Sequence, residues 1–126
     1  MTDQQPVDIV RRFCAAWTTG DLDTIGAFFT DDAVYHNIPV APVVGPAQIK
    51  ATIKGFSGGV ESIEFRLDAI AADGPTVLTE RLDIFTFANG RIELPVMGTF
   101  EVRDGKIAAW RDYFDMAMFL NQIPTA

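Results

Sequence analysis

The sequence is poor in the residue types on which many catalytic and metal sites depend. It has one cysteine, Cys14, and one histidine, His36. A lone cysteine excludes an internal disulfide, and its place on an apolar helical stripe favours a buried structural thiol over a nucleophile. A lone histidine without further ligand residues predicts no metal site. A Ser-His-Asp triad is poorly supported, because neither Ser57 nor Ser62 lies in a nucleophile-elbow pattern.

Positive charge and long apolar runs are also scarce. The chain has 10 Lys and Arg against 17 Asp and Glu, giving a net charge of -7. This balance argues against a nucleic-acid partner, because binding a polyanion requires a basic surface. No apolar run is long enough for a membrane span, and the first residues lack the regions of a signal peptide. We therefore expect a cytoplasmic protein of one domain, residues 1–126, without a nucleic-acid or membrane partner.

One strand carries two opposite charges on an otherwise apolar face. The run Thr79–Phe85 has strand character, and its Arg81 and Asp83 are two residues apart, so both side chains leave the same face. Val77, Phe85 and Phe87 share that face. Buried charges cost free energy unless they are paired, so the sequence predicts a partner for this pair on a neighbouring strand.

The strand pairing can be predicted from two turns. A two-residue loop at Asn89-Gly90 places Asp83 opposite Val96 and Arg81 opposite Gly98. A three-residue loop at residues 103–105 then places Asp112 opposite Val96. A two-residue loop at 104–105 would instead turn Asp112 to the opposite face unless a β-bulge corrected it.

Arg81 is well placed in this arrangement to bind two carboxylates at once. Strands lie about 4.8 Å apart, and Gly98 leaves the space above it open, so Arg81 can cross the glycine and reach both Asp83 and Asp112. The cluster is either a functional unit or an ion-pair network that only fixes the sheet. Two acids that share one base on an apolar face favour function.

A shorter strand over 33–37 places Tyr35 and Asn37 on one side and His36 on the other. If that side faces Asp112, the phenol and the amide can hold a water molecule beside the carboxylate. The alternative is a hydrogen-bonded pair at the end of a strand. No role is predicted for His36.

The other periodic segments complete an α+β fold. Helices are predicted over Pro6–Thr18, after the capping residue Asp21 with an apolar stripe that reaches Phe29, and from Pro46 to Phe56. Four strands follow as an antiparallel meander, the last three being 76–87, 91–102 and 106–114. The apolar tail 115–121 can form a turn of helix over the cavity mouth or pack on a second subunit. Together these elements predict helices that cover one face of a curved sheet and leave a cone-shaped apolar pocket.

Four segments resemble the limonene-1,2-epoxide hydrolases, which have the cone-shaped NTF2-like (SnoaL-like) α+β fold typified by nuclear transport factor 2 and ketosteroid isomerase. The segments are Tyr35-His36-Asn37-Ile38-Pro39, Thr79-Glu80-Arg81-Leu82-Asp83, Leu94-Pro95-Val96-Met97-Gly98 and Trp110-Arg111-Asp112-Tyr113-Phe114-Asp115. They follow the family's order, and the resemblance covers nearly the whole chain. The N-terminus is shorter than in some members.

The resemblance implies a role for each polar residue. Tyr35 and Asn37 would help Asp112 hold and activate a water molecule, while Arg81 and Asp83 would supply the bridge and the acid. We hypothesise that Asp112 is the base and Asp83 the acid, because opening an epoxide without a covalent intermediate needs both at once. No cofactor or metal is expected. The family implies a homodimer.

The expected substrate is a small apolar epoxide, cyclic or aryl, which water would open to a vicinal diol. The residues predicted to shape its pocket are Phe85, Leu94, Val96, Trp110, Phe114 and Phe119. Two other functions remain open on the sequence alone. One is proton transfer of the ketosteroid isomerase type, against which Arg81 counts. The other is a non-catalytic binding or dimerisation module of the same fold.

Overall fold

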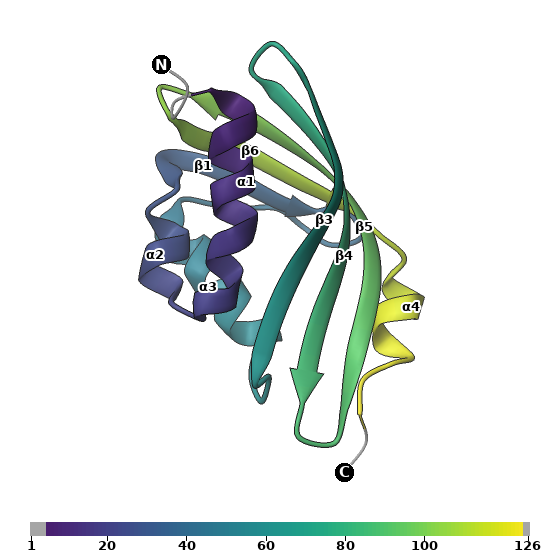
Figure 1. Cartoon of the computed structure of the whole chain (residues 1–126). Coiled ribbons are helices and arrows are strands. Elements are labelled where there is room, and N and C mark those ends of the chain that lie inside the picture. Colours follow the sequence, from purple (N-terminus) through teal and green to yellow (C-terminus); the bar gives the residue numbers. More distant parts are fainter. Residues whose placement is uncertain (1–4, 125–126) are drawn as a thin grey trace.

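The computed structural model describes residues 5–124. It contains four α-helices, one turn of 3-10 helix and six strands, shown in Figure 1. In chain order these are α1 (Pro6–Ala16), η2 (Trp17–Thr19), α2 (Leu22–Gly26), β1 (Phe29–Asn37), β2 (Val43–Val44), α3 (Pro46–Phe56), β3 (Ser62–Asp73), β4 (Thr76–Phe87), β5 (Gly90–Arg103), β6 (Lys106–Tyr113) and α4 (Met116–Leu120). Within this range no helix is long and apolar enough to cross a membrane.

The helices form where the sequence predicts them, with two differences in length. The first α-helix ends at Ala16 rather than Thr18 and continues as the 3-10 turn η2, and α2 is shorter than predicted. Proline occupies the first turn of both α1 and α3, where its missing N–H costs no hydrogen bond. Asp21 caps α2 by accepting a hydrogen bond from the backbone N–H of Asp23. The predicted extension of this helix to Phe29 is wrong, because Phe29 is the first residue of β1 and its backbone neighbour is Ile107 of β6.

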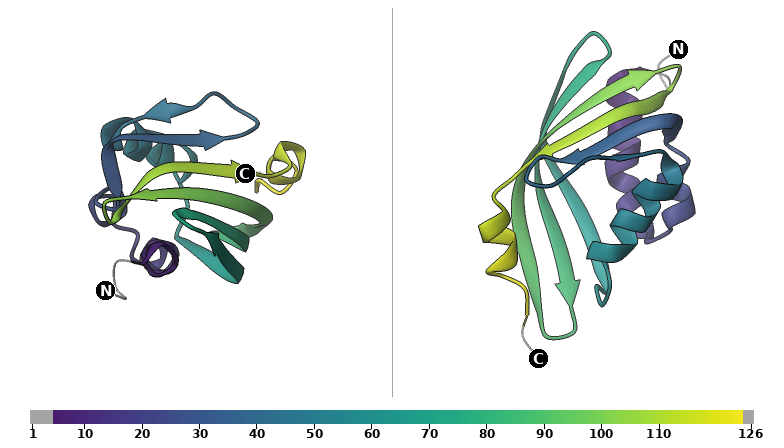
Figure 2. Two further views of the ribbon diagram at one scale, coloured as in Figure 1. Left: turned by 90° about the horizontal axis from the view of Figure 1, so that it is seen from above. Right: turned by 180° about the vertical axis from the view of Figure 1, so that it is seen from behind.

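The six strands form one sheet in the order β2-β1-β6-β5-β4-β3. All neighbours are antiparallel except β1 and β6, which are parallel. The expected mainly antiparallel α+β architecture is therefore confirmed. Figures 1 and 2 show α1, α2 and α3 packed on one side of the sheet and α4 beside β5. The Phe85 ring of β4 meets both Phe56 of α3 and Phe119 of α4, so these two helices border the same space.

The predicted register between β4 and β5 is wrong by two residues. Ala88 and Asn89 form the turn, so Asp83 pairs with Leu94 and Arg81 pairs with Val96, while Gly98 lies opposite Thr79. A shift of two residues leaves every side chain on its expected face, because the side-chain period of a strand is two. The prediction of which β4 side chains share the apolar face is therefore still correct.

The turn between β5 and β6 has two residues, not the predicted three. Asp104 and Gly105 both have positive φ, 53° and 79°, as a tight hairpin turn requires. A β-bulge follows in β6, since Val102 pairs with Ile107 but Glu101 pairs with Ala109. The extra residue turns Asp112 back to the face of Arg81. Asp112 thus lies opposite Gly98 rather than Val96.

The core is an aromatic cluster between α1 and the sheet. Phe13 packs edge-on against Trp17, Phe100 and Trp110, with ring centroids 5.0–6.0 Å apart. Trp17 and Trp110 are both fully buried. A second, smaller group of buried apolar side chains on β4 and β5 lies beside the cavity described below; its members are Phe85, Ile92, Leu94 and Val96. The large cluster supports one end of the sheet and leaves the other end free to line a pocket.

Candidate active site

Arg81 binds Asp83 and Asp112 at once. Its Nε and Nη2 donate to Asp83 at 2.9 and 2.8 Å, and its Nη1 and Nη2 donate to Asp112 at 3.0 and 2.8 Å. Arg81 is 1% exposed and each aspartate 4%. These bonds to both edges of the planar guanidinium are the arrangement that the sequence predicts, and burial makes them strong.

Gly98 provides the room for this cluster. A Cβ atom on Gly98 would lie 2.5 Å from Arg81 Nη1 and 2.7 Å from Asp112 Oδ1, closer than packed atoms allow. The prediction that the guanidinium crosses a bare glycine is confirmed, although Gly98 pairs with Thr79 and Asp112 rather than with Arg81. A larger residue at position 98 would displace the cluster.

The two carboxylates differ in their hydrogen-bond donors. Asp112 accepts a third hydrogen bond, 2.7 Å long, from the indole Nε1 of Trp110 on the same face of β6. Asp83 accepts hydrogen bonds only from Arg81 among the residues that the structure describes. Because hydrogen bonds to a carboxylate stabilise its ionised form, this difference favours the negative charge on Asp112.

Burial and mutual charge set the protonation of the cluster. Burial raises the pKa of Asp83 to about 6; the Arg81 charge opposes this rise, and Asp112 adds to it. Burial alone would lower the pKa of Arg81, but the two carboxylates raise it well above its ordinary value. The arginine therefore stays charged, while the pKa of Asp83 lies above its ordinary value.

Aromatic rings fix the guanidinium from one side. The Arg81 Cζ atom lies 4.5 Å from the centre of the Phe65 ring, within the range of a cation–π interaction. Trp17 stacks on Phe65 with ring centres 4.2 Å apart. Arg81 is thus held by ionic contacts at its edges and by an aromatic face.

Tyr35 and Asn37 lie beside Asp112 because β1 runs parallel to β6. In this register Tyr35 pairs with Trp110, and Asn37 pairs with Asp112. The Tyr35 hydroxyl donates to Asn37 Oδ1 at 3.1 Å, and its ring stacks on Trp110 at 4.1 Å. Burial and the nearby Asp112 charge raise the pKa of Tyr35, so its hydroxyl remains a neutral donor.

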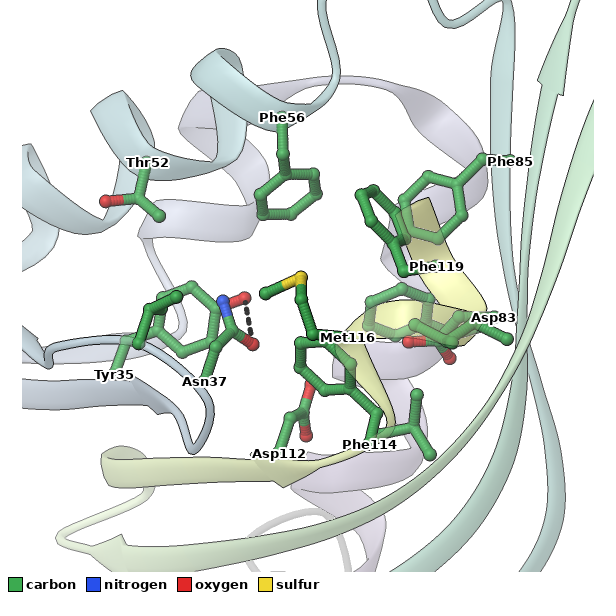
Figure 3. A pocket seen from close by; sticks show the side chains of 14 residues that line it. Tyr35, Asn37, Thr52, Phe56, Asp83, Phe85, Asp112, Phe114, Met116 and Phe119 are labelled. Carbon is green, nitrogen blue, oxygen red and sulfur yellow. Dashed lines mark hydrogen bonds between the residues drawn. The ribbon is translucent and has the colours of Figure 1, made fainter. Parts of the chain in front are cut away.

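These groups open into a cavity of about 240 Å³. Figure 3 shows Tyr35 and Asn37 across the cavity from Asp83, with Asp112 below them. The remaining walls are largely apolar. The lining residues are Tyr35, Asn37, Val40, Thr52, Phe56, Phe65, Asp83, Phe85, Leu94, Val96, Asp112, Phe114, Met116 and Phe119. Arg81 lies behind this surface and contacts the cavity only through its two carboxylate partners.

Five of the six predicted pocket residues line the cavity: Phe85, Leu94, Val96, Phe114 and Phe119. Trp110 does not, because its ring is fully buried between Tyr35 and the core, from where it bonds Asp112. This placement corrects the prediction, which assigned Trp110 from the face of its strand alone.

The predicted site lacks five of the lining residues, namely Val40, Thr52, Phe56, Phe65 and Met116. The sequence did place Phe56 on the apolar face of its helix and Phe65 in an alternating strand. That signal marks a buried face but does not separate the core from a cavity wall.

The described residues form no metal-ligand group, and their one thiol is buried. Within 5–124 no three His, Cys, Asp or Glu side chains are grouped so that they could hold a metal ion. Cys14 is buried, and burial raises the pKa of its thiol to about 12. A thiol in this state is a poor nucleophile.

The curved sheet, the covering helices and a polar cluster at the base of an apolar pocket define an NTF2-like α+β protein with an enzyme-like site. Solved structures agree with this fold. A polyketide cyclase homologue from Xanthomonas campestris has a TM-score of 0.83 at 20% identity and covers 98% of this chain and 100% of its own.

Closer relatives define the family. The model of the limonene-1,2-epoxide hydrolase catalytic domain matches residues 4–125. Epoxide hydrolase EphG of Mycobacterium tuberculosis is 38% identical over 107 residues, which are 85% of this chain and 71% of EphG. A solved M. tuberculosis LEH-like epoxide hydrolase has a TM-score of 0.81 and 35% identity over 94% of this chain and 88% of its own. The chain belongs to the limonene-1,2-epoxide hydrolase family.

Proposed function

We propose that this protein adds water to a small apolar epoxide in one step and releases a vicinal diol. The observation that carries the proposal is the single buried guanidinium that bonds two inequivalent carboxylates at the base of an apolar cavity. Family membership supports the same reaction, because the M. tuberculosis relative is an epoxide hydrolase.

The inequivalence assigns a role to each acid. Asp112, with its extra hydrogen bond from Trp110, is the ionised base. It accepts a proton from a water molecule that Tyr35 and Asn37 help to hold, while the water oxygen forms a bond to an epoxide carbon. Asp83, with its raised pKa, donates its proton to the epoxide oxygen as the carbon–oxygen bond breaks.

The net charge of Arg81, Asp83 and Asp112 together stays constant during this step. Before the reaction the cluster consists of one cation, one anion and one neutral acid, and afterwards the two acids have exchanged states. The guanidinium bonds both carboxylates and can stabilise the anion on either side. A proton returning from Asp112 to Asp83 completes the cycle. Little charge therefore develops in an apolar site where uncompensated charge is costly.

The cavity supports a compact substrate. Its volume of about 240 Å³ and its aromatic walls, Phe56, Phe85 and Phe119, suit a cyclic or aryl epoxide. Strain in the three-membered ring supplies the driving force, so we propose that no cofactor takes part. A homodimer and a cytoplasmic location also remain proposals.

Hydrolysis of small epoxides in oxygen-18 water tests the reaction. We expect one labelled oxygen in the diol and none in a protein carboxylate, even in a single turnover. Label in Asp83 or Asp112 would indicate a covalent ester and contradict the one-step mechanism.

Two substitutions test the roles. Asp83→Asn and Asp112→Asn should each lower kcat by at least about 1000-fold, because each removes one half of a paired acid–base step. Circular dichroism should show an intact fold. Turnover near the wild-type rate in either variant would refute the assignment, and isomerisation of an apolar enone by the wild type would favour the ketosteroid isomerase alternative.

A further inference from the structure

One wall of the cavity comes from a short and weakly anchored segment. Helix α4 contributes Met116 and Phe119 to the lining, and none of its residues is buried. The Phe119 ring meets Phe85 edge-on at 5.9 Å. The position of α4 therefore sets the size of the cavity on this side, but the helix has little buried surface of its own to hold it there.

The strand beside α4 has an open edge. Strand β6 pairs with β5 only from Met97 to Arg103, so the stretch 90–96 pairs with β4 alone among the strands of residues 5–124. Leu94 and Val96 of this stretch line the cavity. A free edge presents N–H and C=O groups that need partners.

Gln122 supplies those partners at Glu93. Its side-chain Oε1 accepts from the Glu93 backbone N–H at 3.0 Å, and its Nε2 donates to the Glu93 carbonyl at 3.0 Å. The amide thus pairs with β5 as a residue of a neighbouring strand would. Nε2 also donates to the Met118 carbonyl at 3.1 Å, so one side chain links the open edge to α4.

We propose that Gln122 is a positioning residue that determines which epoxides the cavity accepts, an inference that rests on the proposed epoxide hydrolysis. Gln122 lines no part of the cavity and acts through α4. By fixing the helix against β5, it holds Phe119 on Phe85 and keeps Met116 over the polar groups (Figure 3). With this link removed, the wall can move outward and admit a bulkier epoxide.

The test compares Gln122→Met with Gln48→Met. Methionine keeps the length of the side chain and removes its hydrogen bonds. Gln48 is a matched control, because its Oε1 also accepts from a backbone N–H, that of Val44 at 3.0 Å, and it does not line the cavity. Both variants and the wild type are assayed with cyclohexene oxide as the small substrate and trans-stilbene oxide as the bulky one.

For Gln122→Met we expect KM for cyclohexene oxide to rise about fivefold to tenfold, with kcat within about twofold of wild type. The ratio of kcat/KM for stilbene oxide to that for cyclohexene oxide should rise by at least about fivefold. Gln48→Met should leave both values unchanged. A purely structural role would lower kcat/KM for both substrates by the same factor, and that result would overturn the proposal.

Hydrogen exchange provides a readout that does not depend on turnover. Amides of 116–123 should exchange faster in Gln122→Met than in Gln48→Met, while β4 exchanges at the same rate in both. Unchanged exchange at 116–123 would show that Gln122 does not fix α4. A wild type that hydrolyses no epoxide would instead overturn the proposed function and, with it, the claim about selectivity.

Discussion

The two buried tryptophans differ in one hydrogen bond. Trp110 donates its indole N–H to Asp112, whereas Trp17 Nε1 has no partner among the residues that the structure describes. Both rings belong to the same aromatic core and stack on a neighbour. The pair therefore separates the effect of a ring in the core from the effect of a donor to the proposed base.

We predict that Trp110→Phe lowers kcat by about 10- to 100-fold with little change in KM, because a buried carboxylate loses a donor. Trp17→Phe removes an N–H that has no partner within residues 5–124 and should leave kcat within about twofold, despite a similar loss of ring volume. Steady-state kinetics and melting temperatures of both variants provide the check. Equal losses of kcat would show that Trp110 acts only through packing.

The raised pKa of Asp83 predicts how stability and activity depend on pH. Its folded-state value of about 6 lies above the ordinary 3.8, so this group favours the folded state at acidic pH. That contribution disappears as the pH rises through 6. Activity should fall over the same range, because the acid loses its proton.

Melting temperature and kcat/KM, measured from about pH 4 to 9, would show both effects. In Asp83→Asn, which cannot titrate at this position, the dependence of stability on pH should be flatter. A wild-type kcat/KM that stays constant from about pH 5 to 9 would contradict the role of Asp83 as the acid.

Strand β5 contributes to the site through Gly98, which leaves space for the Arg81 guanidinium. Gly98→Ala would place a methyl group within 2.9 Å of Thr79 Oγ1 and closer still to Arg81 and Asp112. We expect a loss of about 3 kcal/mol in the free energy of unfolding and of at least about 100-fold in kcat/KM. Denaturant titration and kinetics would measure both.

Gly55 in α3 is the matched control, because a Cβ atom there would meet nothing within 4 Å. Gly55→Ala should leave activity unchanged and the free energy of unfolding unchanged or raised by up to about 1 kcal/mol. If Gly98→Ala behaved in the same way, the guanidinium would have room that the structure does not show.

The elements also show what the sequence could predict. Side-chain alternation placed Arg81, Asp83 and Asp112 on one face, and that prediction is confirmed because a register shift of two preserves faces. The registers themselves were wrong, since both depend on which residues enter a tight turn. The sequence predicts the bulge in β6 only conditionally: with a two-residue turn, a bulge is needed for Asp112 to face Arg81. The apolar pattern constrains which way a strand faces, but the exact pairing depends on turn geometry.

At the scale of the whole molecule, the cavity depends on how distant elements dock. Thr52 and Phe56 come from α3, Phe65 from β3 and Met116 from α4. Periodicity predicted buried faces on most of these elements but not the relative placement of the elements, which decides whether a side chain fills the core or lines a pocket. The polar cluster was predictable because opposite charges on an apolar face require one another.

The outer face of the sheet is the surface on which we predict dimerisation. Met97 and Tyr113 are cross-strand partners there and are 53% and 46% exposed. Met97→Glu should shift a dimer towards monomer in analytical ultracentrifugation, because a charge in an apolar interface is costly. Val44, 52% exposed on β2, is the control, and Val44→Glu should leave the mass unchanged. If Met97→Glu remained a dimer, as Val44→Glu is expected to, this face would be excluded as the interface.

The parallel pairing of β1 with β6 has a consequence for folding: the proposed site is complete only when these two strands have paired. Asn37 meets Asp112 across this pairing, so a nascent chain that ends before β6 would carry Arg81 and the proposed acid, Asp83, without the proposed base. During refolding, epoxide turnover should return only after the last strand docks on the first, later than the spectroscopic signal of the β3–β5 meander. Recovered catalysis would then report completion of the sheet.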